Sequence, residues 1–86
     1  MMSKEAKVVQ KLLNRVRANN MTIYDAGEEL RLRYHMDDRL HKAVLDVFDQ
    51  VLLEGIRHRE AVEELADLCQ YAVVESDQRA QEAGAD

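Results

Sequence analysis

The sequence predicts an all-α protein, a small bundle of three to four antiparallel helices that forms a dimer. Apolar residues recur every three or four positions, which is the spacing of one helix face. Val, Ile and Thr do not alternate with polar residues, as strands with one buried face require. The chain has no proline and only three glycines, so few positions interrupt a helix. We expect a single helical domain over residues 1–75 and a polar, flexible tail over residues 76–86.

A first helix is expected over residues 4–18. Ser3 can accept a hydrogen bond from an unpaired amide of the first turn. One face of this segment is apolar and comprises Val8, Val9, Leu12, Leu13 and Val16. Asn19 and Asn20 then interrupt the pattern, and asparagine tolerates the left-handed conformation that often ends a helix.

A second helix is expected over residues 23–34. Thr22 followed by Asp25 resembles a capping box in which Asp replaces the usual Glu. Gly27 lies on the narrow apolar stripe of this helix. We expect this glycine to allow a neighbouring helix to approach closely. In exchange, glycine destabilises the helix by about 1 kcal/mol relative to alanine.

A third helix is expected to begin at Asp38, capped by Asp37 or Asp38. Between residues 38 and 54 it is apolar around most of its circumference, whereas an outer helix of a small monomer needs one stripe. This helix is therefore either central in the bundle or partly buried by a second copy of the chain. An 86-residue chain without a disulfide has a marginal core, which favours a homodimer. The predicted dimer interface consists of Leu45, Leu52, Leu53 and Ile56.

A fourth helix is expected over residues 57–75. Gly55 can cap the preceding helix or be tolerated in one long bent helix, and we favour a break there. One face of the fourth helix is apolar, and its opposite face carries four carboxylates at helical spacing. These carboxylates are either a solvated exterior or a docking face for a basic protein partner. The predicted partner-binding residues are Glu60, Glu63, Glu64 and Asp67.

Charge is unevenly distributed along the chain, whose formal net charge is −5. Residues 1–36 carry seven Lys or Arg and four Asp or Glu, whereas residues 37–86 carry five and thirteen. The acidic half argues against unspecific binding to nucleic acid, because phosphates need a cationic surface. A basic row on the first helix, Lys4, Lys7, Lys11 and Arg15, keeps a DNA-binding alternative open.

The first two helices have the rough size of a helix-turn-helix. The second helix would then present Asp25, Glu28 and Glu29 to the major groove, where recognition helices usually present Arg, Lys, Asn or Gln. The leading functional hypothesis is therefore a small non-enzymatic regulatory or adaptor protein, bacterial or from a phage, that binds protein partners. The alternative is a small dimeric DNA-binding transcriptional regulator that uses the basic first helix.

Catalytic and metal-binding patterns are not apparent in the sequence. His35, His41 and His58 lack a histidine partner one helical turn away, and Glu54 and His58 are separated by Gly55. Cys69 lies in the middle of an apolar face, which indicates a buried, inert thiol. We expect no enzymatic activity, no cofactor, no metal and no membrane span, and a cytoplasmic location.

Overall fold

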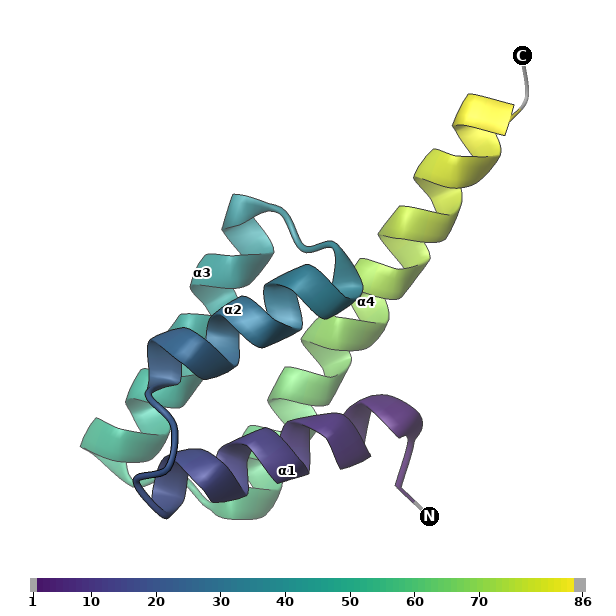
Figure 1. The fold of residues 1–86 in the computed structure, drawn as a ribbon. Helices are drawn as coiled ribbons and strands as arrows, with labels where there is room; N and C mark the ends of the chain where they lie inside the picture. The colour runs from purple at the N-terminus through teal and green to yellow at the C-terminus, as the bar shows by residue number, and fades with distance from the viewer. Residues whose placement is uncertain (1, 85–86) are drawn as a thin grey trace.

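The described part of the protein is built from four α-helices and one short π-helical segment. The computed structural model describes the backbone of residues 2–84 and the side chains of residues 2–78. The helices are α1 (Lys4–Arg17), α2 (Ile23–Tyr34), α3 (Asp38–Asp49) and α4 (His58–Gly84), and the π-helical segment is η1 (Gln50–Glu54). No strand occurs within residues 2–84, which confirms the all-α prediction (Figure 1). α1 packs mainly on α4, α2 mainly on α3, and α3 and α4 pack on each other.

The first three helices begin at the caps that the sequence predicts. The side chains of Ser3 and Thr22 accept hydrogen bonds from the backbone N–H of Ala6 and Asp25, each at 3.1 Å. Asp37 accepts from the backbone N–H of Leu40 at 2.9 Å, so Asp37 rather than Asp38 is the cap of α3. Each cap satisfies one amide that the helix leaves unpaired, and such a cap typically stabilises a helix by about 1 kcal/mol.

Helices α1 and α2 and the segment η1 are followed by left-handed backbone. Asn19 has a φ of 61° and His35 a φ of 55°, so the predicted role of Asn19 is confirmed and His35 has the same role after α2. Gly55 has a φ of 68° and caps η1, which confirms the predicted break. In η1 the backbone N–H of Gly55 donates to the carbonyl of Gln50, five residues earlier. Leu52 and Leu53 lie in this segment, and both are exposed.

Helix α4 continues beyond its predicted end. The sequence pattern ended this helix at Glu75, but helical backbone extends to Gly84, so the predicted boundary is wrong. Residues 76–83 contain neither glycine nor proline and include Gln, Arg, Ala and Glu, which favour helix without an apolar stripe. The predicted mobility of the tail stays a prediction, and residues 85–86 lie outside the described residues.

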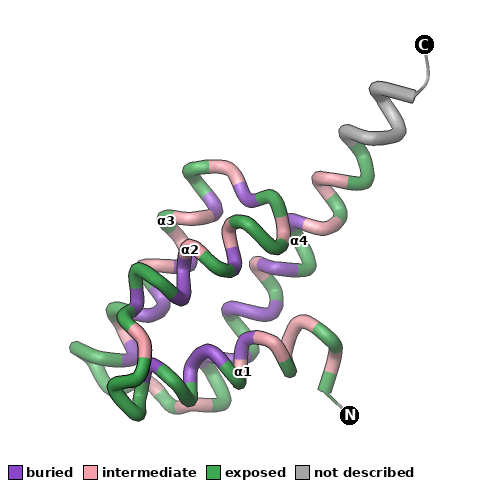
Figure 2. The backbone as a smooth tube through the Cα atoms, viewed as in Figure 1, coloured by how far each residue is buried: buried purple, intermediate pink, exposed green. Residues whose placement is uncertain are grey.

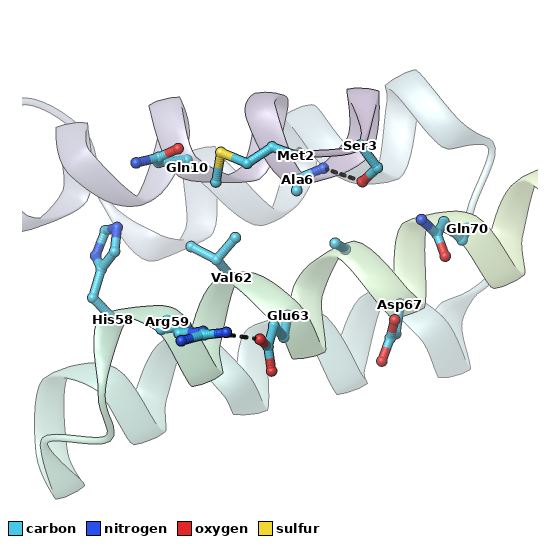
Figure 3. A pocket seen from close by; sticks show the side chains of 11 residues that line it. Met2, Ser3, Ala6, Gln10, His58, Arg59, Val62, Glu63, Asp67 and Gln70 are labelled. Carbon is cyan, nitrogen blue, oxygen red and sulfur yellow. Dashed lines mark hydrogen bonds and ion pairs between the residues drawn. The ribbon is translucent and has the colours of Figure 1, made fainter.

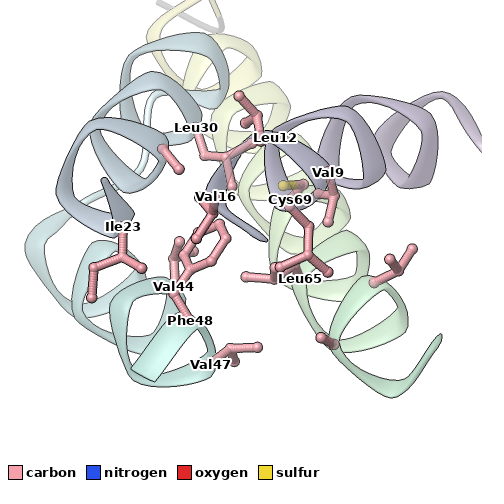
Figure 4. Packing of buried hydrophobic residues seen from close by; sticks show 14 of the residues in the cluster. Val9, Leu12, Val16, Ile23, Leu30, Val44, Val47, Phe48, Leu65 and Cys69 are labelled. Atoms are coloured by element: carbon pink, nitrogen blue, oxygen red, sulfur yellow. The ribbon is translucent and has the colours of Figure 1, made fainter. Parts of the chain in front are cut away.

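One hydrophobic cluster joins all four helices (Figures 2 and 4). Its largest fully buried side chains include Phe48, Leu13, Leu30 and Leu65. Helix α3 has α2 and α4 as neighbours, and it buries Leu40, Val44, Val47 and Phe48. Its contacts with these two helices therefore account for the buried face of α3, whereas α2 and α4 each pack on three helices. Burying a side chain the size of Phe48 stabilises the fold by roughly 1.5–3 kcal/mol.

Gly27 allows α2 and α3 to lie close together, as the sequence predicts. A Cβ atom at this position would lie 2.7 Å from Cδ2 of Leu45 and 3.5 Å from Nε2 of His41. Leu45 therefore packs on the backbone of α2, and a side chain at position 27 would displace it. The close approach compensates for the poor helix propensity of glycine.

Candidate protein-binding surfaces

The four carboxylates predicted to bind a partner form an exposed face of α4. All of Glu60, Glu63, Glu64 and Asp67 are exposed, and we call this set the acidic face. Within the described side chains, Glu63 is the one member with an ion pair, to Arg59 at 3.3 Å between Oε1 and Nε. The other three lack a cation partner there. Like charges spaced by one turn repel, so an external cation would be attracted to this face.

Two grooves flank the acidic face, one toward α1 and the other toward α3. Asp67 lines both grooves, Glu63 lines the groove toward α1, and Glu64 lines the groove toward α3. Consecutive carboxylates of one helix thus border different grooves. A partner that enters either groove would meet at least two carboxylates at its edge.

The α1–α4 groove is the larger, with a volume of about 710 Å³ (Figure 3). Val62 points from α4 toward α1, while Arg59 is engaged with Glu63 at the edge. The lining is mixed, because apolar residues alternate with amide, hydroxyl, imidazole and guanidinium groups. Its residues are Met2, Ser3, Ala6, Gln10, His58, Arg59, Val62, Glu63, Ala66, Asp67 and Gln70.

The α3–α4 groove is smaller, about 450 Å³, and more apolar. Its lining includes four apolar or aromatic residues, which we call its floor: Ala43 and Val47 of α3, and Leu68 and Tyr71 of α4. The exposed Glu64 and Asp67 complete the lining, and we call them its edge. Tyr71 remains 49% exposed. Sequence reasoning missed both grooves, because they depend on the spacing of helices that are distant in sequence. The available signal was Tyr71 itself, a large residue next to Leu68 at the margin of the apolar face.

The four predicted dimer-interface residues lie in two different environments. Leu52 and Leu53 are 54% and 82% exposed. Leu45 packs on Gly27, and Ile56 is partly buried against the core, so both already have contacts within the chain. Leu52 lines a hollow of about 560 Å³ together with residues 19–25, including the exposed Tyr24. Leu52 and Leu53 are therefore the members of this set that remain available to a second copy.

The basic row of α1 is exposed and is not neutralised by α4. Within the described side chains, none of Lys4, Lys7, Lys11 and Arg15 forms an ion pair. Lys11 and Arg15 line a hollow of about 250 Å³ with Arg33 and Glu29. Arg31 is paired with Glu28, and this bond lowers the pKa of Glu28 from its ordinary value. This surface favours an anionic ligand, whereas the acidic face favours a cationic one.

Cys69 and the histidines do not form a chemical site with one another. Cys69 is fully buried, and burial, followed by the charge of Glu5, raises the pKa of its thiol to about 12. The prediction of a buried thiol is confirmed. Within residues 2–78, no group of three His, Cys, Asp or Glu is placed to hold a metal ion. None of the described helices is long and apolar enough to cross a membrane.

Comparisons with known proteins give no match: no protein-family model, no curated protein and no solved structure is similar to this chain.

Proposed function

We propose that the chain is a small non-enzymatic adaptor or regulatory protein that binds a basic protein partner through the acidic face of α4. The supporting observation is that Glu60, Glu64 and Asp67 are exposed without an ion pair in the described residues, and that Glu64 and Asp67 line grooves that can receive side chains. Surface charges of one sign steer oppositely charged partners and accelerate their association. We place this function in the cytoplasm of a bacterium, with the gene in the bacterium or its phage.

The proposal includes a homodimer that forms through Leu52 and Leu53. These two side chains are exposed at the end of the bundle. Burying each leucine fully in a dimer would contribute roughly 1.5–3 kcal/mol. A two-fold symmetric contact would place the same residues of both copies against each other. Sedimentation over a range of concentrations tests the dimer, and a monomer at high concentration would reject it.

The acidic face is tested by capturing partner proteins from a bacterial lysate with the natural chain and with a triple variant. Replacing Glu63 and Glu64 by Gln and Asp67 by Asn removes three charges without shortening a side chain. We expect the triple variant to capture less partner than the natural chain, because its association is slower, while its helical spectrum stays unchanged. The difference in capture should shrink as salt rises. The matched control replaces the exposed Glu29, Asp49 and Glu54 by their amides, which changes the net charge equally away from this face. Unchanged capture by the first variant at low salt would mean that the acidic face is only a solvated exterior.

A second candidate function is DNA binding by the basic row of α1. The observation that favours it is the exposure of Lys4, Lys7 and Lys11 without ion pairs in the described residues. The exposed Asp25 and Glu29 of α2 oppose it, because they would lie near the phosphates. Titration of a fluorescent DNA duplex with the protein tests this second function. Replacing the three lysines by Gln would make the DNA affinity less dependent on salt only if the basic row contacts phosphates.

A further inference from the structure

The α3–α4 groove combines an apolar floor with an acidic edge. Ala43 and Val47 are one helical turn apart on α3, and Leu68 and Tyr71 are nearly one turn apart on α4. We propose that this groove is the docking site for a basic amphipathic helix of the partner protein. This inference rests on the proposed function and specifies which groove, and which kind of segment, the acidic face uses.

The spacing of the floor residues fits a helix. Four residues of α-helix rise by about 6 Å, so Ala43 and Val47 are separated by the same interval as residues i and i+4 of an incoming helix. Leu68 and Tyr71 continue the apolar surface on the opposite side of the groove. A short apolar stripe with i, i+3 or i+4 spacing can therefore lie along the groove, which is how amphipathic helices dock in grooves of other helical proteins.

The charges around the groove select a basic helix rather than an acidic one. Glu64 and Asp67 lie at the α4 edge, and both are exposed without an ion pair in the described residues. On α3, the exposed Lys42 and Asp46 offset each other. The guanidinium of Arg39 lies 3.3 Å from Glu75, and this bridge connects α3 and α4. The local charge is therefore negative, and Lys or Arg beside the apolar stripe of the partner would pair with the edge.

Tyr71 extends the apolar floor toward the acidic edge. Its side chain is half-exposed, so the ring presents apolar area that a partner can cover. The stem of a partner lysine can lie along such a ring while its ammonium group reaches Asp67, four residues earlier on the same helix. Tyrosines in this situation often dominate the binding energy of an interface.

The α1–α4 groove is less suited to the same partner. Arg59 and His58 line it, and Arg59 already neutralises Glu63 at its edge. A lysine-rich helix would meet a guanidinium and one unpaired carboxylate there, that of Asp67, whereas the α3–α4 groove offers both Glu64 and Asp67. Docking in one groove or the other therefore predicts opposite relative effects on binding when two adjacent residues, Glu63 and Glu64, are changed.

The test uses a synthetic helical peptide of about 18 residues, long enough to be helical when bound, with one leucine stripe and lysines elsewhere. Its binding to the full chain is followed by fluorescence anisotropy. We expect Glu64→Gln to raise the dissociation constant about two- to fivefold, as loss of one exposed charge pair does. Tyr71→Ala should raise it about tenfold or more. The matched controls, Glu54→Gln and Tyr24→Ala, should leave it unchanged, because both positions are exposed away from this groove. Glu63→Gln should weaken binding less than Glu64→Gln, and a peptide with glutamate in place of lysine should not bind.

Three results would overturn the docking site. The first is that the basic peptide fails to bind. The second is that Glu63→Gln weakens binding while Glu64→Gln does not, which would place the helix in the α1–α4 groove. The third is that both variants weaken binding equally and Tyr71→Ala has no effect, which would indicate diffuse charge attraction. The last two results leave the acidic face as a binding surface, so they reject this inference and retain the proposed function. That function fails separately if the triple amide variant captures its partner normally.

Discussion

Replacing Gly55 by alanine should destabilise the protein through backbone strain alone. Gly55 has a φ of 68°, and an added Cβ would meet no atom within 4 Å, so no clash contributes. A non-glycine residue in left-handed backbone costs about 1–2 kcal/mol. Alanine also restricts the unfolded chain, which recovers about 0.4–1 kcal/mol of the free energy of unfolding. The net loss should be about 1 kcal/mol, which lowers the melting temperature of a domain of this size by roughly 4–8 °C.

Thermal unfolding followed by circular dichroism measures this loss, and the sign of the change is decisive. If α3 and α4 were one continuous helix in solution, Gly55→Ala would instead stabilise it by about 1 kcal/mol of helix propensity. Gly55→Asn is the control, because asparagine tolerates left-handed backbone and should lose less stability than alanine. A melting temperature that rises with alanine would refute the break between the helices, and with it the geometry of the α3–α4 groove.

Four further predictions concern packing, the thiol and the exposed leucines. Gly27→Val should lower stability by about 1–3 kcal/mol in urea unfolding, because its side chain would overlap Leu45. Native Cys69 should resist a thiol reagent at pH 8.5 and react once urea unfolds the chain. Because folding raises its pKa from 9.0 to about 12, the free energy of unfolding should fall as pH rises between these values. Leu53→Glu should give a folded monomer by light scattering, since position 53 is exposed within one chain; a persistent dimer would place the interface elsewhere.

Local signals in the sequence were sufficient to predict where the first three helices begin. A capping side chain acts within three residues, so Ser3 and Thr22 could be assigned without any knowledge of tertiary contacts, and the cap of α3 could be narrowed to Asp37 or Asp38. The core faces of the helices were equally readable, because their apolar residues recur with helical spacing. The role of Gly27 also followed from its place on an apolar stripe, and the structure confirms it.

Features that depend on contacts between helices could not be predicted in this way. Leu45 and Leu52 are seven residues apart and share a face on a regular helix, yet Leu45 packs on α2 while Leu52 is exposed within the π-helical segment. Met36 is buried although its position suggested a short link. The exposure of the acidic face was predictable from its spacing, but the groove that separates Glu64 from Glu63 depends on where α3 and α1 pack.

The central claim, that the acidic side of α4 contacts a partner protein, is tested most directly by site-specific photo-crosslinking in the cells that make the chain. An aromatic photoreactive amino acid, which keeps a ring at position 71, replaces Tyr71 in one version and Leu32 in another, because both positions are exposed and they lie on different helices. We predict a discrete crosslinked product from position 71 that weakens when Glu64 is changed to Gln, and no such product from position 32. A product from position 32 alone, or one from position 71 that is unaffected by Glu64→Gln, would contradict the account.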